Sequence, residues 1–412
     1  MKKIKWHTKM VQVLLIILVA STIFMCSVVK ISAGTEPMEW KWPPSLKIGT
    51  VEMGGSAYIV TTAWIPVLEQ TTGMKVRIIP SANEAMSARW LQRGDLDIQQ
   101  SACSNVAEYL ISGKDSYATR DGGPFQLRFV YLVKNSYGGY IVRRDSDIKT
   151  IYDLKPGMRF AVFKAVPAAV DQIHALLAWV NIKPDDVKLI PFGSFSANIK
   201  SVVEGKSDVA LAYSTAPAAY QSEASPHGIR WLELPPEDNN GYKRALSRRF
   251  TMVLGELEGG VKSSIGTKGF ISPFGAYTLS DTDPDLIYQL VKWQNDNFDA
   301  YKDKHEMCKQ TKINTLKKVL DNMPIPAHEG LIRYLKEKGM WTADNESWQK
   351  YNVDLLTKYE KAYNEAVARA DKRKIQVNPG NKEWIELWEN YKKELKLPPI
   401  KMRVMAQELG YK

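Results

Sequence analysis

Short apolar runs of strand length alternate twice along this chain with segments of helical spacing. The first set runs from residue 46 to 100 and the second from about 140 to 213. The first run, Leu46 to Thr50, leads into Gly54-Gly55-Ser56 and a helical pattern, and the last run of the second set is Asp208 to Tyr213. Such alternation is typical of parallel strands joined by right-handed helical crossovers. The sequence therefore predicts two α/β lobes that share an architecture without visible similarity in sequence.

The composition is that of a globular protein. The chain has 412 residues, of which 44% are hydrophobic and 25% are charged, enough for two or three domains. The formal charge is +11, but five of the cations lie in the first 33 residues, which hold no acid. The other Lys and Arg residues are dispersed among acids, which argues against a nucleic-acid partner.

The N-terminus has the pattern of an export signal. A cationic stretch from Met1 to Lys9 precedes an uncharged apolar run from Val11 to Val29, and small residues follow up to Gly34. We expect a signal peptide over residues 1–33, with an uncleaved membrane anchor as the alternative because the run approaches the length of a membrane span. Either outcome places the remainder in the periplasm or elsewhere outside the cytoplasm.

The predicted domains follow the two sets of elements. We expect a first part of lobe 1 at 46–138, lobe 2 at 139–248, a return to lobe 1 with helices at 249–342, and a helical extension at 343–412. The aromatic residues of the extension recur at helical steps, so we expect it to pack on the outer face of a lobe through Trp384 and Trp388. Two exported α/β lobes favour a solute-binding protein, with an exported α/β enzyme as the competitor.

Catalytic and metal-binding patterns are not found in the sequence. There is no G-x-S-x-G elbow and no phosphate loop, and the three cysteines and five histidines lack ligand spacing. We therefore predict neither an enzyme nor a cofactor or metal.

Several short segments follow one another in a specific order along the chain. They are Ile48-Gly49-Thr50 with Gly54-Gly55-Ser56-Ala57-Tyr58, Pro80-Ser81 before a helix that ends Leu91-Gln92-Arg93-Gly94-Asp95-Leu96-Asp97, Ile148 to Leu154, Val203 to Ala210, and Pro324 to Tyr334. This order resembles the TAXI family, the solute receptors of tripartite ATP-independent periplasmic (TRAP) transporters. The similarity extends from about residue 46 to about residue 341 and is most specific in its final segment.

The resemblance implies a type II periplasmic binding protein fold, with two α/β lobes, a hinge and a cleft, here followed by the helical extension. It implies a receptor that captures a small polar, carboxylate-bearing organic solute and delivers it to a multi-span TRAP permease driven by an ion gradient. We also expect the receptor to be a monomer. A membrane-tethered ligand-sensing domain and the receptor of an ATP-driven importer are the alternatives.

Candidate ligand residues in the first lobe lie at helix starts and strand ends. Backbone N–H groups at a glycine-rich helix start favour an anion. Glu84 departs from the T-x-x-S-x-x-N pattern of the family: it either completes a capping box with Ser81, or faces the cleft and favours an amine over a carboxylate. The candidates here are Gly54, Gly55, Ser56, Tyr58, Ser81, Glu84, Ser87 and Gln100.

In the second lobe, Lys164 to Val170 stand where the family commonly has G-A-P-G-S-G-T. In the family, the amides and hydroxyls of this loop hold an anionic group at a helix start. The loop of this chain lacks those glycines and hydroxyls, so it should bind an anion less well, which argues against a plain dicarboxylate. Ser214 either hydrogen-bonds the ligand or caps the following helix, as Thr215 could also do. We expect His328 to fix a turn before a helix. The candidates of this lobe are Lys164, Pro167, Ala168, Tyr213 and Ser214.

Overall fold

The computed structural model describes residues 40–131, 134–321 and 323–403, in two units, Met1–Pro43 and Pro44–Lys412. In the first unit, the rings of Trp40 and Trp42 pack edge to face with centroids 6.1 Å apart. The export signal expected at 1–33 lies outside the described residues. Within them, no helix has the length and apolar character that crossing a membrane requires. The fold below is that of the second unit.

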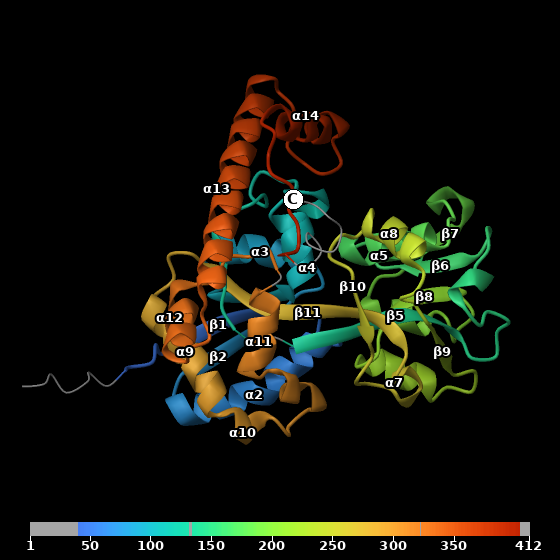
Figure 1. Cartoon of the computed structure of the whole chain (residues 1–412), viewed down its shortest axis with the longest axis horizontal. Helices are drawn as coiled ribbons and strands as arrows, with labels where there is room; N and C mark the ends of the chain where they lie inside the picture. Colours follow the sequence, from blue (N-terminus) through green and yellow to red (C-terminus); the bar gives the residue numbers. More distant parts are fainter. Residues whose placement is uncertain (1–39, 132–133, 322, 404–412) are drawn as a thin grey trace, which may run out of the picture. The chain divides into compact units, whose positions relative to one another are not determined.

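Three parallel strands form one end of the sheet, in the order β2-β1-β3. They are β1 (Ser45–Thr50), β2 (Lys75–Pro80) and β3 (Ile98–Ala102), and helices α2 (Ser56–Thr72) and α3 (Glu84–Gln92) connect them (Figure 1). Ile48 of β1 is fully buried, as expected for a central parallel strand.

Three further parallel strands form the other end, in the order β7-β6-β8. They are β6 (Arg159–Val162), β7 (Lys188–Pro191) and β8 (Val209–Tyr213), connected by helices α5 (Pro167–Trp179) and α6 (Phe195–Lys200). In both sets the first strand along the chain is central and the second and third flank it. The predicted repetition of architecture is therefore confirmed.

Two long antiparallel strands join the ends into one continuous sheet (Figure 1). Strand β11 (Lys268–Leu279) pairs with β3 through its C-terminal part and with β5 (Lys134–Arg143) through Phe270 to Phe274. Strand β5 in turn pairs with β8. Short strands complete the sheet: β4 (Leu127–Phe129) and β10 (Val253–Glu256) pair with β11, and β9 (Ile229–Leu232) pairs with β5.

Lobe 1 consists of strands β1 to β4, helices α2 and α3, the short helices α4 (Cys103–Asn105) and η1 (Val106–Leu110), and residues 280–341. Lobe 2 consists of strands β6 to β9 and helices α5, α6, α7 (Pro217–Glu223) and α8 (Asn239–Leu246). The predicted fold, two α/β lobes with added helices, is confirmed. The remaining short helices are η2 (Asp115–Tyr117), η3 (Ile151–Asp153), η4 (Pro184–Asp186), η5 (Lys262–Ser264), α9 (Pro284–Asp296), α10 (Phe298–Tyr301), η6 (Glu306–Gln310), α11 (Ile313–Leu320) and α12 (Glu329–Glu337).

Two helices follow lobe 1, α13 (Ala343–Lys372) and α14 (Lys382–Glu394), at the orange and red end of the colour scale in Figure 1. Trp384 and Trp388 are buried, and their indole Nε1 atoms donate to the carbonyls of Ala118 and Ser112 at 2.9 and 3.0 Å. The expected docking through these two tryptophans onto a lobe is confirmed.

Candidate functional site

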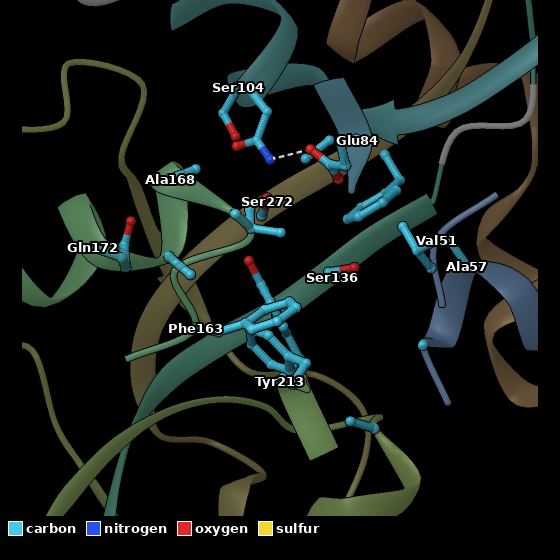
Figure 2. A pocket seen from close by; sticks show the side chains of 18 of the residues that line it. Val51, Ala57, Glu84, Ser104, Ser136, Phe163, Ala168, Gln172, Tyr213 and Ser272 are labelled. Atoms are coloured by element: carbon cyan, nitrogen blue, oxygen red, sulfur yellow. Dashed lines mark hydrogen bonds between the residues drawn. The ribbon is translucent and has the colours of Figure 1, made fainter. Parts of the chain in front are cut away.

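A cavity of about 110 Å³ lies between the lobes and is lined by both (Figure 2). It lies at the carboxyl ends of the parallel strands, where α/β sheets bind ligands. This volume accommodates several water molecules or a small solute. Lobe 1 contributes Val51, Glu52, Gly54, Gly55, Ala57, Ser81, Ala82, Glu84, Ala102, Ser104 and Asn105, and lobe 2 contributes Phe163, Val166, Ala168, Ala169, Gln172, Phe195, Ser196, Ile199, Tyr213 and Ala216.

The connecting segments form the rest of the lining. Strands β5 and β11 place Ser136 and Ser272 between the lobes, as Figure 2 shows. Arg249 comes from the segment between α8 and β10. The strands that join the lobes therefore also form a wall of the cavity.

Glu84 is the first residue of α3, and Asn83 caps that helix. The Asn83 side chain accepts a hydrogen bond from the backbone N–H of Met86 at 3.0 Å. The Ser81 hydroxyl accepts from the N–H of Asn83 at 3.1 Å instead of capping the helix. The capping box of Ser81 with Glu84 is therefore wrong, because the helix begins two residues later than that box requires. The Glu84 side chain therefore takes no part in capping the helix, and it lines the cavity.

The Glu84 carboxyl group is buried, with 9% of the residue exposed. Asn105 donates its side-chain N–H to Glu84 Oε2 at 2.6 Å, the bond drawn dashed in Figure 2. Burial raises the pKa of Glu84 because the charged form loses hydration, and the Asn105 hydrogen bond opposes this effect. Glu84 forms no salt bridge with any Lys, Arg or His that the structure describes, but the charge of Arg249, which is paired with Glu108, also lowers the pKa of Glu84.

Arg249 and Glu108 form a buried ion pair beside the cavity. Arg249 Nη1 lies 3.1 Å from Glu108 Oε2, and each side chain is 6% exposed. Thr251 donates both its N–H and its hydroxyl to the other Glu108 oxygen, at 3.0 and 2.7 Å. Burial is the largest single influence and lowers the pKa of Arg249, but the charge of Glu108 together with Tyr109 and Tyr213 raises it overall. The arginine is therefore a fixed cation.

Three buried polar atoms of the lining have no hydrogen-bond partner among the described residues. They are Ser104 Oγ, Gln172 Nε2 and Arg249 Nε. The three residues are only 3%, 4% and 5% exposed. Because burying an unpaired polar group is costly, such atoms indicate a place where another molecule completes the hydrogen bonding.

Two helices direct their N-termini at the cavity, α2 from lobe 1 and α5 from lobe 2. Their N-caps are Gly55 and Val166, and neither helix has a capping side chain or a first-turn acid among the described residues. Gly55 is required for close packing, because a Cβ there would lie 2.5 Å from Val51 Cγ2. These helix starts leave partial positive charge beside the cavity.

Aromatic side chains of lobe 2 and β11 form an apolar wall, which we call the aromatic wall: Phe163, Phe195, Tyr213 and Phe270. The rings of Phe195 and Tyr213 stack with centroids 5.4 Å apart, and Phe163 meets Phe195 edge to face at 6.1 Å. In Figure 2, Glu84 lies at one end of the view and Phe163 and Tyr213 at the other. The cavity therefore has a polar end and an apolar end.

Direct contacts across the cavity mouth connect the lobes. Glu52 of lobe 1 accepts a hydrogen bond from the backbone N–H of Phe195 in lobe 2 at 3.1 Å. Burial raises the pKa of Glu52, and this N–H lowers it. On another side, Asp171 of α5 accepts from the hydroxyl of Tyr109 and lies 3.2 Å from Lys114 Nζ. These contacts therefore connect the two lobes directly, without a bridging molecule.

Six of the thirteen residues predicted for ligand binding line the cavity: Gly54, Gly55, Ser81, Glu84, Ala168 and Tyr213. Pro167 lines a smaller adjoining cavity of about 10 Å³, which shares Glu84, Asn105 and Ala168 with the main one. Ser56 begins α2, and its side chain is outside the described part of the structure.

The other five predicted residues are placed elsewhere. Gln100 is buried and accepts from the Thr61 hydroxyl at 2.6 Å, and the Ser87 hydroxyl donates to the Asn83 carbonyl at 3.4 Å. Lys164 is exposed, and Tyr58 is half-buried on α2. Ser214 donates to the carbonyl of Gly259, and its capping alternative is wrong because Ala216 is the N-cap of α7.

Sequence reasoning missed Asn105, Gln172 and Arg249. Asn105 follows β3 by three residues, so the rule that ligands bind beyond strand ends could have indicated it. Gln172 lies one turn beyond Ala168 on α5 and could have been inferred from helical spacing. Arg249 lies in a segment without a local signal. His328 caps α12 by accepting from the N–H of Gly330 at 3.2 Å, which confirms its predicted role at a turn.

A single sheet shared by two α/β lobes, with a lined cavity at the strand ends, defines the two-lobed fold of periplasmic binding proteins. The chain belongs to the NMT1-like family, whose model matches residues 48–339. A search of curated proteins gives no significant match. Among the described residues, no group of three or more His, Cys, Asp or Glu side chains could hold a metal ion.

Solved structures with similarity to this chain include three binding proteins. The periplasmic aliphatic sulphonate binding protein SsuA from Escherichia coli is 16% identical, with a TM-score of 0.42 over 77% of this chain and 88% of that one. A binding component of an ABC phosphonate transporter from Pseudomonas aeruginosa is 13% identical, with a TM-score of 0.43 over 80% and 99%. A putative ABC binding component from Wolinella succinogenes, complexed with lysine, is 12% identical, with a TM-score of 0.39 over 67% and 98%.

Proposed function

We propose that this protein is an extracytoplasmic solute receptor that captures a small, carboxylate-bearing organic solute and delivers it to a TRAP-type membrane permease. The observation that carries the proposal is the cavity between the lobes, which is lined by three buried polar atoms without partners in the described chain. A solute that satisfies those atoms would also bridge the lobes, so binding and closure would be coupled.

The order of segments that resembles the TAXI family supports the choice of a TRAP permease as partner. The receptor would undergo no chemical step: the closed form presents the solute, and release follows when the contacts of Glu52 with Phe195 and of Asp171 with Tyr109 open. The export pattern at residues 1–33 supports a location outside the cytoplasm.

The first test is a thermal-shift screen of residues 34–412 against carboxylates, amino acids, amines, betaines and sugars, because a ligand that binds the folded state raises the unfolding temperature. A saturable shift with one class supports a receptor. If no compound of the panel raises the unfolding temperature, the proposal is contradicted.

The second test addresses the partner. The receptor is added to vesicles that contain the candidate permease, and uptake of labelled solute is followed. Uptake that stops when an ionophore collapses the ion gradient, and that needs no ATP, supports a TRAP permease. Uptake that depends on ATP would assign the receptor to an ATP-driven importer instead.

A further inference from the structure

The lobe 1 side of the cavity offers a site for a cation. Glu84 is buried: its carboxylate accepts from the neutral amide of Asn105, and the nearby charge of Arg249, which acts on it, is already paired with Glu108. One arginine beside two buried carboxylates, Glu84 and Glu108, leaves one negative charge without a full counter-charge, which is unfavourable. A positively charged group of the solute would supply that charge, and the neighbouring Ser104 hydroxyl could accept a further hydrogen bond from it.

The lobe 2 side offers a site for an anion. Arg249 Nη1 contacts Glu108 and donates to the carbonyl of Ala168 at 3.3 Å, while its Nε lacks a partner in the described chain. Gln172 lies on the same face of α5 as Ala168 and also presents an unpartnered N–H group. Both atoms are hydrogen-bond donors close to α5, whose N-terminus has no capping side chain, and together they suit a carboxylate.

The two sites face each other with an apolar region between the lobes. Figure 2 shows Glu84 and Gln172 on opposite sides of the cavity, with Phe163 and Tyr213 at a third. The aromatic wall presents rings, and its described members carry no charge. A second carboxylate on the solute, as in glutamate or a dicarboxylate, would meet this wall without a partner.

We propose that the solute is an α-amino acid with an apolar side chain. Its ammonium group pairs with Glu84, its carboxylate accepts from Arg249 Nε and Gln172 Nε2, and its side chain packs against the aromatic wall. This inference rests on the proposed receptor function and names the class of its solute.

Matched ligands test this inference by isothermal titration of residues 34–412. The set is L-leucine, 4-methylpentanoate, which lacks the amine, and 3-methylbutylamine, which lacks the carboxylate; L-phenylalanine with its two analogues forms a second set. We expect an amino acid of either set to bind at least about tenfold more tightly than both of its analogues, since each analogue leaves a buried polar group unpaired. An analogue that binds as tightly as its amino acid overturns the inference.

Two variants separate the subsites. Glu84→Gln should weaken binding of the amino acid and leave the des-amino acid unaffected. Gln172→Met should weaken both carboxylates and leave the amine unaffected. The exposed Glu386→Gln on α14 is the control and should change none of these affinities. Equal losses for all three ligands in Glu84→Gln would indicate a general structural defect and would overturn the assignment of the ammonium site.

The same titrations separate this inference from the proposed function. If succinate, L-glutamate or a sugar binds more tightly than every apolar amino acid, the solute class is wrong and the receptor function stands. If no member of the panel binds to the folded protein, both are wrong.

Discussion

Arg249 and Glu108 form an ion pair between the segment before β10 and the π-helical turn η1, 3.1 Å apart, with both side chains 6% exposed. Each partner compensates the buried charge of the other, so the effects of replacing the two residues on stability should not be additive. Its place beside the cavity makes it both a structural link and the source of the proposed anion site.

Removal of one partner should be far more harmful than removal of both. We expect Glu108→Gln to lower the free energy of unfolding by about 3–5 kcal/mol, because it leaves the Arg249 charge buried and unpaired. The double variant Glu108→Gln with Arg249→Met should recover a large part of that loss in urea denaturation. Additive losses would contradict a coupled pair.

Glu84 should reduce stability at neutral pH. Its pKa is raised in the folded protein, so the folded state binds the proton of Glu84 more tightly than the unfolded state does. The free energy of unfolding therefore falls as the pH rises above the ordinary pKa of a glutamate. We therefore expect Glu84→Gln to be more stable than the parent at about pH 7.5 and nearly equal to it at about pH 4. Urea denaturation at both pH values checks this. A less stable variant at the higher pH would show that the ionised carboxylate stabilises the fold.

His328 should make the protein sensitive to mild acid. Burial lowers its pKa, so the folded state keeps it neutral while the unfolded chain gains a proton below about pH 6.5. Its contribution to stability is complete above that pH and is lost as the pH falls toward the lowered folded value. His328→Asn retains a side chain able to cap α12 and should flatten the loss of stability between about pH 7.5 and about pH 5.5. An unchanged slope would contradict this assignment.

Gly123 should not tolerate a methyl group. A Cβ there would lie 2.2 Å from Tyr363 Cε1, so Gly123→Ala should cost about 1–3 kcal/mol of stability. Gly193→Ala is the matched control, because a Cβ at that position meets nothing within 4 Å. The cost of Gly123→Ala should shrink in a Tyr363→Leu background, which a double-mutant cycle measures. An equal cost in both backgrounds would rule out Tyr363 as the cause.

The helical extension should contribute to the stability of lobe 1. Trp384 is fully buried and donates to Ala118, so Trp384→Ala should cost about 3–5 kcal/mol if the protein unfolds as one unit. Deletion of residues 343–412 should likewise lower the melting temperature. A deletion variant that melts at the same temperature as the parent would show that the extension docks without stabilising the lobe.

The order of strands and helices could be predicted because it follows from the local spacing of apolar residues. The buried runs at β1 and β8 are apolar, and Gly205 ends the turn after α6 with a φ of 70°. Strand β11 begins at Lys268, in a stretch where the local pattern does not predict a strand. Gly269 and Pro273 interrupt the apolar alternation there, and pairing with β5 and β10 overrides that local signal.

The cavity was only partly predictable for a related reason. Ser81 and Asn83 both suit an N-cap, and the choice between them depends on the hydrogen bond from the Asn83 N–H to the Ser81 hydroxyl. Arg249 and Glu108 are far apart in the sequence, and neither stands in a local pattern that predicts their contact. Cavity residues at the ends of parallel strands can be predicted from the sequence. Cavity residues that lie on β5, on β11 or in the segment between α8 and β10 cannot.

Because the chain passes between the lobes through β5 and β11, we expect the two lobes to fold at different stages. The strands of lobe 2 and their helices come from one continuous stretch, Lys134 to Leu246, whereas lobe 1 needs both the first strands and β11. The strands β1, β2 and β3 pair within a short stretch, but the pairing of β3 with β11 closes a long loop of chain, at a cost in chain entropy. Lobe 2 can form first and shorten that loop, so we expect the pairing of β3 with β11 to be the late event of folding.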